Sequence, residues 1–219
     1  MTHPDGLDGL LAEQVAYYRA RAPEYDAGAL DLPGGDEVVA ALDAFAPTGG
    51  VVELACGTGA WTVQLLRHAD AVTAVDSSPE MLELAAHRVG KDRRVRFVLA
   101  DLISWRPERR YDVVFFGFWI SHVPVERFAT FWELVGECLA PGGRVFFADD
   151  AYRTNDELVE GRDSTTIERR LEDGTRFRVV KVPHSAAGLK RHLRELGWTI
   201  EVHETAGPFY WGAGSPAIG

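Results

Sequence analysis

The chain has few cysteines, no long apolar run and no secretory signal. Its only two cysteines, Cys56 and Cys138, lie far apart and outside any CxxC motif. Disulfide scaffolds, structural zinc sites and iron–sulfur clusters are therefore not expected, and we predict no metal site. The longest apolar run, residues 113–120, is much shorter than the about 20 residues of a membrane span. Residues 1–6 lack the charged and apolar segments of a signal peptide, so we expect a cytoplasmic protein.

Basic side chains are also scarce. The 219 residues include 23 basic and 33 acidic side chains, which gives a formal net charge of −10. A protein that binds nucleic acid or an anionic membrane needs a basic face, so neither partner is expected. The deficit is uneven: residues 1–80 hold 3 basic and 13 acidic groups, whereas residues 165–194 hold 8 and 3. The first region suits a cationic ligand, and the second suits an anionic one.

Apolar strands alternate with helices between residues 51 and 148. The strands are expected at residues 51–55, 71–76, 95–99, 111–116 and 144–148. Because they are apolar throughout, they indicate a parallel sheet that is covered on both faces. A β-hairpin over 165–182, a helix over 185–196 and two short strands follow. The pattern predicts an α/β fold, a Rossmann-like three-layer sandwich with a hairpin inserted before its last helix.

The turn after the first strand has the composition of a ligand-binding loop. Small residues in the segment Glu-Leu-Ala-Cys-Gly-Thr-Gly (53–59) let backbone amides approach a ligand at a helix N-terminus. Dinucleotide enzymes place G-x-G-x-x-G here, but neither register of this pattern is complete: Ala55 occupies the first glycine position if Gly57 is the second, and Thr62 occupies the third if Gly57 is the first. Glu53 would crowd a pyrophosphate and suits an ammonium or sulfonium group instead. A dehydrogenase is therefore the least favoured interpretation.

Two carboxylates end the next two strands. Asp76 lies 17 residues after Gly59, where it can accept hydrogen bonds from both hydroxyls of a ribose. Asp101, followed by Leu102, ends the third strand within reach of an adenine amino group. Open α/β sheets bind ligands at the carboxyl ends of their strands, so these residues indicate one nucleoside site. The alternative is that the acids cap helices and the glycines form a tight turn.

Four segments resemble, in order, the motifs of class I S-adenosylmethionine-dependent methyltransferases. They are Glu-Leu-Ala-Cys-Gly-Thr-Gly (53–59), Val-Asp-Ser-Ser-Pro-Glu-Met-Leu (75–82), Ala-Asp-Leu (100–102) and Leu-Ala-Pro-Gly-Gly (139–143). The resemblance implies a seven-stranded, mostly parallel sheet with a reversed last strand. It implies S-adenosylmethionine as cofactor and S-adenosylhomocysteine as product. The cofactor-binding residues that it implies are Tyr18, Arg21, Glu53, Ala55, Gly57, Gly59, Trp61, Asp76, Ser77, Met81, Asp101, Leu102 and Phe116.

We expect one methyltransferase domain over residues 1–219. Its parts are a helical lid at 1–46, a cofactor-binding core at 47–149, a substrate-side insertion with the hairpin at 150–183, and the last helix and strands at 184–219.

A closer resemblance covers nearly the whole chain. Residues 17–26, 115–124 and 168–182 are similar to the phosphonate O-methyltransferase family of dehydrophos biosynthesis. That family implies substrate binding by Arg169 and Lys181, and we add Trp119 and Tyr25 as expected substrate contacts. Residues 27–33 lack the tyrosine that the family carries shortly after its Glu-Tyr-Asp segment, so the identity of the acceptor stays open.

The register of the hairpin decides where these two cations point. A two-residue turn would place Arg169 opposite Arg178, which is a like-charge pair. A three-residue turn at 172–174, with a left-handed Gly174, pairs Glu168 with Arg178 instead, and we predict this register. It places Arg169 and Lys181 on a mostly apolar face, which is costly unless an anion meets them. The alternatives are that the charged groups of Arg169 and Lys181 both reach water, or that they pair with carboxylates elsewhere in the chain.

These observations predict a methyltransferase, most simply an O-methyltransferase, that acts on a small anionic metabolite at a phosphonate- or carboxylate-type oxygen. Such an oxygen needs alignment with the methyl group but no general base. A neutral N- or O-acceptor is the alternative, and His122 would then be the catalytic base. The same histidine could instead hold its loop through a backbone hydrogen bond. A protein that binds S-adenosylmethionine without catalysis is a third possibility. The oligomeric state is not predicted.

Overall fold

The centre of the protein is a seven-stranded sheet with the order β3-β2-β1-β4-β5-β9-β8. The computed structural model describes residues 6–22, 32–158, 160–161 and 163–217, so Tyr25 lies outside the described residues. The strands are β1 (Gly50–Leu54), β2 (Ala71–Asp76), β3 (Val95–Leu99), β4 (Tyr111–Gly117), β5 (Leu139–Asp150), β8 (Trp198–Glu204) and β9 (Phe209–Pro216). The strands β1 to β5 pair in parallel, whereas β9, the last strand of the chain, runs antiparallel to both of its neighbours, β5 and β8, which confirms the expected reversed last strand.

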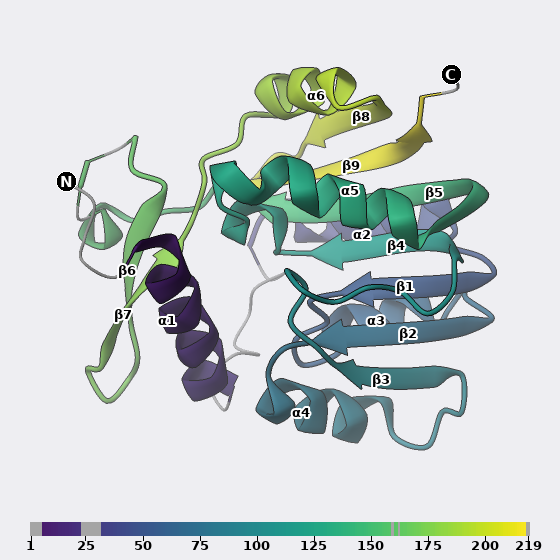
Figure 1. Ribbon diagram of the computed structural model, residues 1–219, viewed down its shortest axis with the longest axis horizontal. Coiled ribbons are helices and arrows are strands. Elements are labelled where there is room, and N and C mark those ends of the chain that lie inside the picture. The colour runs from purple at the N-terminus through teal and green to yellow at the C-terminus, as the bar shows by residue number, and fades with distance from the viewer. Residues whose placement is uncertain (1–5, 23–31, 159, 162, 218–219) are drawn as a thin grey trace.

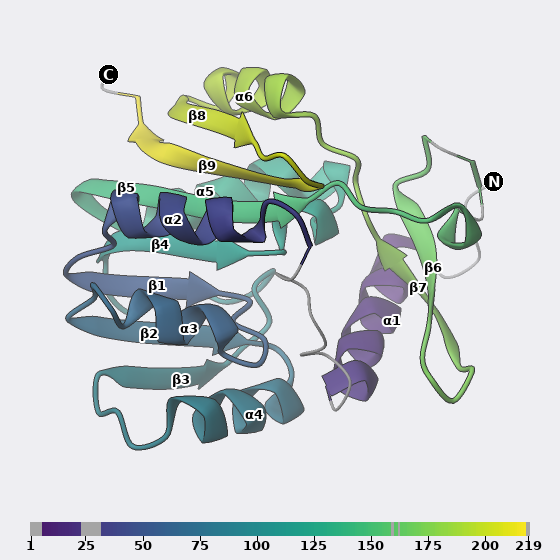
Figure 2. The ribbon, with the colours of Figure 1, turned by 180° about the vertical axis from the view of Figure 1, so that it is seen from behind.

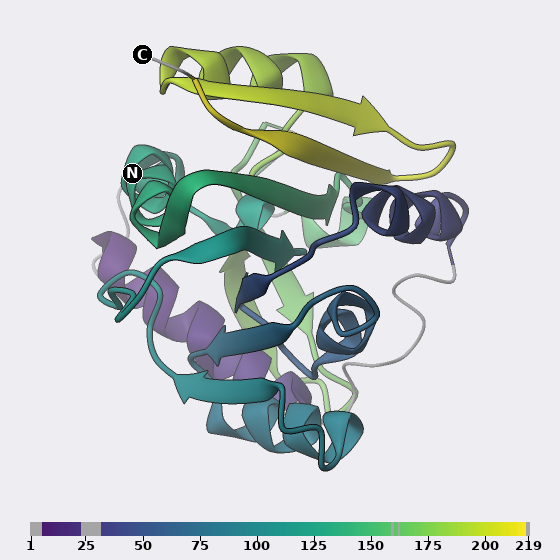
Figure 3. The same ribbon diagram turned by 90° about the vertical axis from the view of Figure 1, so that its right-hand side faces the viewer.

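Helices cover both faces of this sheet. The helix α5 (Phe128–Cys138) lies on one face, and α2 (Gly35–Phe45) and α3 (Ala60–Leu65) lie on the other (Figures 1, 2 and 3). The helix α4 (Pro79–Val89) packs against α3, and α6 (Ala186–Glu195) packs against β8. No helix in the described ranges is long and apolar enough to cross a membrane.

Two pairs of phenylalanines divide the core into two layers. Successive side chains of a strand point to opposite faces of a sheet. Phe115 accordingly stacks on Phe146 on one face, and Phe116 stacks on Phe147 on the other. All four are fully buried, and burial of each contributes roughly 1.5–3 kcal/mol. Phe116 is thus a core residue beneath α5, and the structure does not show the expected contact of its side chain with the cofactor.

The helix α1 (Gly6–Arg21) and a hairpin lie together beyond the carboxyl ends of the sheet strands (Figure 1). The hairpin consists of β6 (Thr166–Arg170) and β7 (Arg176–Val180). Glu168 lies opposite Arg178, and Gly174 has φ +90°, so the predicted three-residue turn is confirmed. The expected lid at 1–46 is divided, because α1 joins the hairpin whereas α2 packs on β5 and β9.

Two consecutive side chains of α1 complete the open edge of β7. The Glu13 carboxylate accepts a hydrogen bond from the Arg178 amide (2.5 Å), and the Gln14 side-chain oxygen accepts one from the Val180 amide (2.9 Å). These amides occupy alternate positions and so leave the strand on the same edge. The helix thereby replaces a neighbouring strand, and α1 and the hairpin form one bonded unit.

Candidate active site

A cavity of about 350 Å³ lies beneath α1, at the carboxyl ends of β1, β2 and β4. Eight expected cofactor-binding residues line it: Tyr18, Ala55, Gly57, Asp76, Ser77, Met81, Asp101 and Leu102. Trp119, expected to contact the substrate, lines it as well. Local sequence patterns did not predict seven further lining residues: Asp8, Leu11, Ala12, Gln14 and Val15 of α1, together with Ile103 and Gly117. Helical periodicity predicted that α1 has a buried face but not which ligand that face covers.

Two residues of the cavity wall have a strained backbone. Ala55 follows β1 with φ +56°, and Phe118 follows β4 with φ +55°. Residues other than glycine rarely adopt this left-handed conformation, and it costs of order 1–3 kcal/mol. Both residues line the cavity, whereas Ala46, the third non-glycine residue with a positive φ among the described residues, lies at the end of α2.

Asp76 is fixed by the glycine-containing loop. The Gly57 amide donates to one carboxylate oxygen (2.8 Å) and the Ser78 amide to the other (2.9 Å). Burial raises the pKa of Asp76, and these amide bonds oppose the rise. Each oxygen retains a further lone pair, so the carboxylate can accept the two hydroxyls of a nucleoside ribose.

Glu53 lies behind the cavity wall rather than in it. Its carboxyl is 1% exposed and accepts a 2.5 Å hydrogen bond from the Thr62 hydroxyl. Burial raises the pKa of Glu53 to about 8; the Thr62 bond opposes this, and the charge of Asp76 adds to it. The structure therefore does not show the expected direct contact of Glu53 with a ligand.

Gly59 and Trp61 also support the site from behind. A Cβ at Gly59 would lie 3.0 Å from Ala85, so this glycine allows α3 and α4 to approach closely. A Cβ at Gly117 would lie 2.5 Å from the indole nitrogen of Trp61, so Trp61 packs directly under the end of β4. Neither residue lines the cavity, so the structure does not show the expected contacts of Gly59 and Trp61 with the cofactor.

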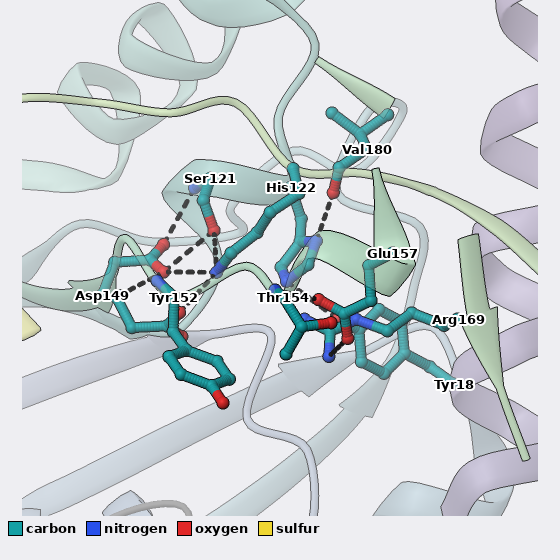
Figure 4. Close-up of polar contacts among 11 residues, drawn as sticks. Tyr18, Ser121, His122, Asp149, Tyr152, Thr154, Glu157, Arg169 and Val180 are labelled. Atoms are coloured by element: carbon teal, nitrogen blue, oxygen red, sulfur yellow. Dashed lines mark hydrogen bonds and ion pairs between the residues drawn. The ribbon is translucent and has the colours of Figure 1, made fainter. Parts of the chain in front are cut away.

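His122 is bonded through both ring nitrogens. Nδ1 lies 2.6 Å from the Val180 carbonyl oxygen, and Nε2 lies 2.8 Å from the Tyr18 hydroxyl (Figure 4). The residue is 5% exposed, and burial holds the pKa of the ring well below its ordinary value. The positive charges of Lys181, Arg169 and Arg21 lower that pKa further.

This geometry does not favour His122 as a catalytic base. It lines a smaller, mostly apolar cavity of about 40 Å³ beside Trp119, not the larger one. With both nitrogens engaged inside the protein, the ring holds its loop to the hairpin backbone. That is the structural alternative which the sequence had left open.

Lys181 is buried among acceptors of its own chain. Its ammonium lies 3.0 Å from the Ser121 hydroxyl, 3.0 Å from Asp150 and 3.5 Å from Asp149. Burial raises the pKa of Asp149, and the charge of Lys181 opposes the rise. Asp149 also accepts hydrogen bonds from the amide and hydroxyl of Ser121 (2.8 and 2.9 Å; Figure 4). Internal carboxylates therefore meet this cation, as one sequence-based alternative held.

Arg169 also has an internal partner. Its guanidinium donates to Glu157 over 2.5 Å, and the other Glu157 oxygen accepts from the Thr154 amide (3.0 Å; Figure 4). Arg169 and Arg21 line an open groove of about 670 Å³, not the cavity beneath α1. Arg21 donates there to the Tyr17 hydroxyl (2.8 Å), so the expected contact of Arg21 with the cofactor is not seen.

The missed carboxylate partners Asp149, Asp150 and Glu157 did carry sequence signals. Asp149 and Asp150 end the fifth strand, the same kind of position as Asp76. Thr154 and Glu157 have the spacing of a capping box, and the structure shows that box at a short 3₁₀ turn. Among the described residues, no group of three or more side chains could hold a metal ion.

The fold and the cavity define a methyltransferase. Residues 51–143 match the family model described as a methyltransferase domain. The protein in the DhpI–SAH complex has 39% sequence identity and a TM-score of 0.84, over 97% of this chain and 99% of that chain. The DhpI–SAM–HEP complex has 42% identity and a TM-score of 0.84, over 95% and 98%. The chain belongs to the family of S-adenosylmethionine-dependent methyltransferases.

Curated relatives match over shorter stretches. Trans-aconitate 2-methyltransferase of Streptomyces avermitilis is 29% identical over 71% of this chain and 59% of its own length. Malonyl-[acyl-carrier protein] O-methyltransferase 1 of Ilyobacter polytropus is 26% identical over 58% of this chain and 47% of its own length. The chain thus spans about half the length of these two relatives.

Proposed function

We propose that this protein transfers a methyl group from S-adenosylmethionine to an anionic oxygen of a small metabolite, of the phosphonate or carboxylate type. One observation carries the proposal. The charges of Lys181, Arg169 and Arg21 all act on the buried ring of His122, whose partner Tyr18 lines the cavity. An anionic acceptor beside the cavity would share these cations with the carboxylates that hold Lys181 and Arg169 in the structure.

The relatives support an acidic acceptor. Two of them are named for methylation of trans-aconitate and of a malonyl group, which are both carboxylates. The similar DhpI chain is described in complex with SAM and HEP.

The residues around the cavity fit the cofactor. All five residues that we assign to it line the cavity: Gly57, Asp76, Met81, Asp101 and Leu102. In this proposal Asp76 accepts the ribose hydroxyls, Asp101 meets the adenine amino group beside Met81 and Leu102, and Gly57 lies under the methionine part. The sulfonium of S-adenosylmethionine supplies an electrophilic methyl group. The side chains of Asp8, Asp76 and Asp101 at the cavity provide surroundings that suit a cationic ligand.

The acceptor is aligned by charge and needs no proton transfer. In this proposal Arg169 and Lys181 orient one oxygen of the acceptor toward the methyl group, and Trp119 forms the wall beside it. An oxyanion is already nucleophilic, so the reaction needs no general base. His122 can therefore keep both ring nitrogens hydrogen-bonded within the protein. Glu157 occupies Arg169 in the structure, and the acceptor has to share or replace this contact.

A turnover screen tests the proposal. The purified protein is incubated with methyl-labelled S-adenosylmethionine and phosphonates, carboxylates, amines or phenols. Labelled methyl esters should form with one or more of the acids. Turnover of only amines or phenols would contradict the anionic acceptor. Cofactor binding without turnover of any class would favour a non-catalytic role.

A further inference from the structure

A chain of three groups connects the backbone of β7 to the cofactor cavity. It runs from the Val180 carbonyl through the His122 ring to the Tyr18 hydroxyl (Figure 4). A carbonyl oxygen can only accept, so Nδ1 of His122 carries the proton in the 2.6 Å bond. Burial and nearby cations keep the pKa of this ring low, so the ring is neutral and Nε2 is an acceptor. The Tyr18 hydroxyl must therefore donate its proton to Nε2.

This direction fixes what Tyr18 offers to a ligand. Its only hydroxyl proton points at His122, so the phenol oxygen can interact with other partners only as an acceptor. Tyr18 lines the cavity, where a positively charged ligand gains from an acceptor and not from a donor. With a protonated ring the direction would reverse, and the hydroxyl proton would be free to point into the cavity.

We propose that His122 is a positioning residue that holds the Tyr18 hydroxyl as a hydrogen-bond acceptor toward the cavity. The arrangement favours the cationic sulfonium of S-adenosylmethionine over the neutral thioether of S-adenosylhomocysteine. This inference rests on the proposed function, because it needs the cofactor in this cavity.

The backbone on both sides of the ring is tied down. The His122 carbonyl accepts a hydrogen bond from Gln14 (3.2 Å), and the preceding Ser121 amide is held by Asp149 (2.8 Å). Gln14 also binds the Val180 amide, so the loop, α1 and β7 share one buried side chain. The rings of Tyr18 and His122 meet edge to face, with centroids 5.4 Å apart. These contacts leave the imidazole little freedom to reorient.

Calorimetric titration without an acceptor tests the inference. Dissociation constants for S-adenosylmethionine and S-adenosylhomocysteine are measured for the wild type, Tyr18→Phe, His122→Leu, His122→Gln and the Tyr18→Phe/His122→Leu double variant. Tyr18→Phe and His122→Leu should each weaken S-adenosylmethionine binding by about five- to tenfold, the effect of one hydrogen bond to a charged ligand. S-adenosylhomocysteine binding should change by less than about twofold.

The variants separate positioning from a purely structural role. The double variant should bind no more weakly than either single one, because both remove the same acceptor. A glutamine carbonyl can accept from Tyr18, so His122→Gln should recover most of the preference for the sulfonium. Tyr111→Phe is the matched control, because Tyr111 begins β4 whereas Gly117, at the other end of that strand, lines the cavity. This substitution should leave the dissociation constants of both ligands unchanged.

Three results would overturn the inference: equal losses for both ligands, additive losses in the double variant, or a folded His122→Leu protein that binds both ligands normally. If the wild type bound neither ligand, the proposed function itself would fail.

Discussion

The hydroxyl of Thr62 donates a 2.5 Å hydrogen bond to the carboxyl of Glu53, a buried acid at the end of β1. Burial raises the pKa of Glu53 to about 8, against about 4.3 in an unfolded chain. Between these values the folded protein holds a proton that the unfolded chain has lost. The stabilisation of the folded protein by this proton is thus complete below the pKa of Glu53 in the unfolded chain, and it is lost as the pH rises toward 8.

Glu53→Gln should remove this pH dependence. The free energy of unfolding of the wild type should fall, relative to that of the variant, by up to about 1.4 kcal/mol per pH unit between about pH 4.5 and 8. Urea titrations at pH 5.5, 6.5 and 7.5 measure the difference. Glu108→Gln, at an exposed ion pair with Arg96, should keep the wild-type slope. Parallel curves for the wild type and Glu53→Gln would count against the buried proton.

Ala55→Gly should stabilise the protein. Relief of the left-handed strain at φ +56° should raise the free energy of unfolding by about 1 kcal/mol. The same substitution at Ala86, which is exposed within α4, should lower it by about 1 kcal/mol. Urea unfolding of both variants checks the opposite signs. A loss of stability at both sites would contradict the role assigned to backbone strain.

Gln14→Leu should loosen α1 from the hairpin. The substitution leaves the Val180 amide and the His122 carbonyl without their partner, which costs about 1–3 kcal/mol for each group that stays buried. Hydrogen exchange should accelerate at the Val180 amide but not at the Lys181 amide, which is bonded to Thr165 within the hairpin. Unchanged exchange at Val180 would show that the helix does not protect this strand edge.

Glu157→Gln should strengthen acceptor binding. The wild-type carboxylate competes with an anionic acceptor for Arg169, whereas a glutamine can still accept from the Thr154 amide. The KM of the acceptor should fall by about three- to tenfold, with the KM of the cofactor unchanged. Asp156→Asn is the control, since Asp156 lines the same groove and is exposed. A rise in the acceptor KM for Glu157→Gln alone would mean that Glu157 orients Arg169 instead of competing for it.

Local sequence patterns predicted the sheet and most of the cofactor cavity. Strand-end residues such as Asp76 and Asp101 occupy positions that chain order alone specifies in a parallel sheet. The hairpin register was also predictable, because it depends on a short turn and on the pairing of Glu168 with Arg178, which are close in the sequence. The layer that Phe116 faces was not predictable, because adjacent residues of a buried strand point to opposite faces and both faces here are aromatic.

The partners of the cations were not predictable in this way. Lys181 meets Asp150 across 31 positions of the chain, and Gln14 meets Val180 across 166. Such contacts depend on how α1 and the hairpin pack relative to the sheet, and local periodicity does not specify this tertiary arrangement. The sequence thus indicated that Arg169 and Lys181 need anions but not that the chain supplies carboxylates itself.

In the proposed function, cations of the hairpin hold an anionic acceptor beside the cofactor. The most direct test is the acceptor KM of Arg169→Ala, compared with Arg176→Ala on the same hairpin, whose side chain is 61% exposed. Arg169→Ala should raise the KM for the acid acceptor by about 10- to 100-fold while the affinity for S-adenosylmethionine is unchanged, and Arg176→Ala should match the wild type. Equal acceptor KM values for the wild type and Arg169→Ala would contradict the claim.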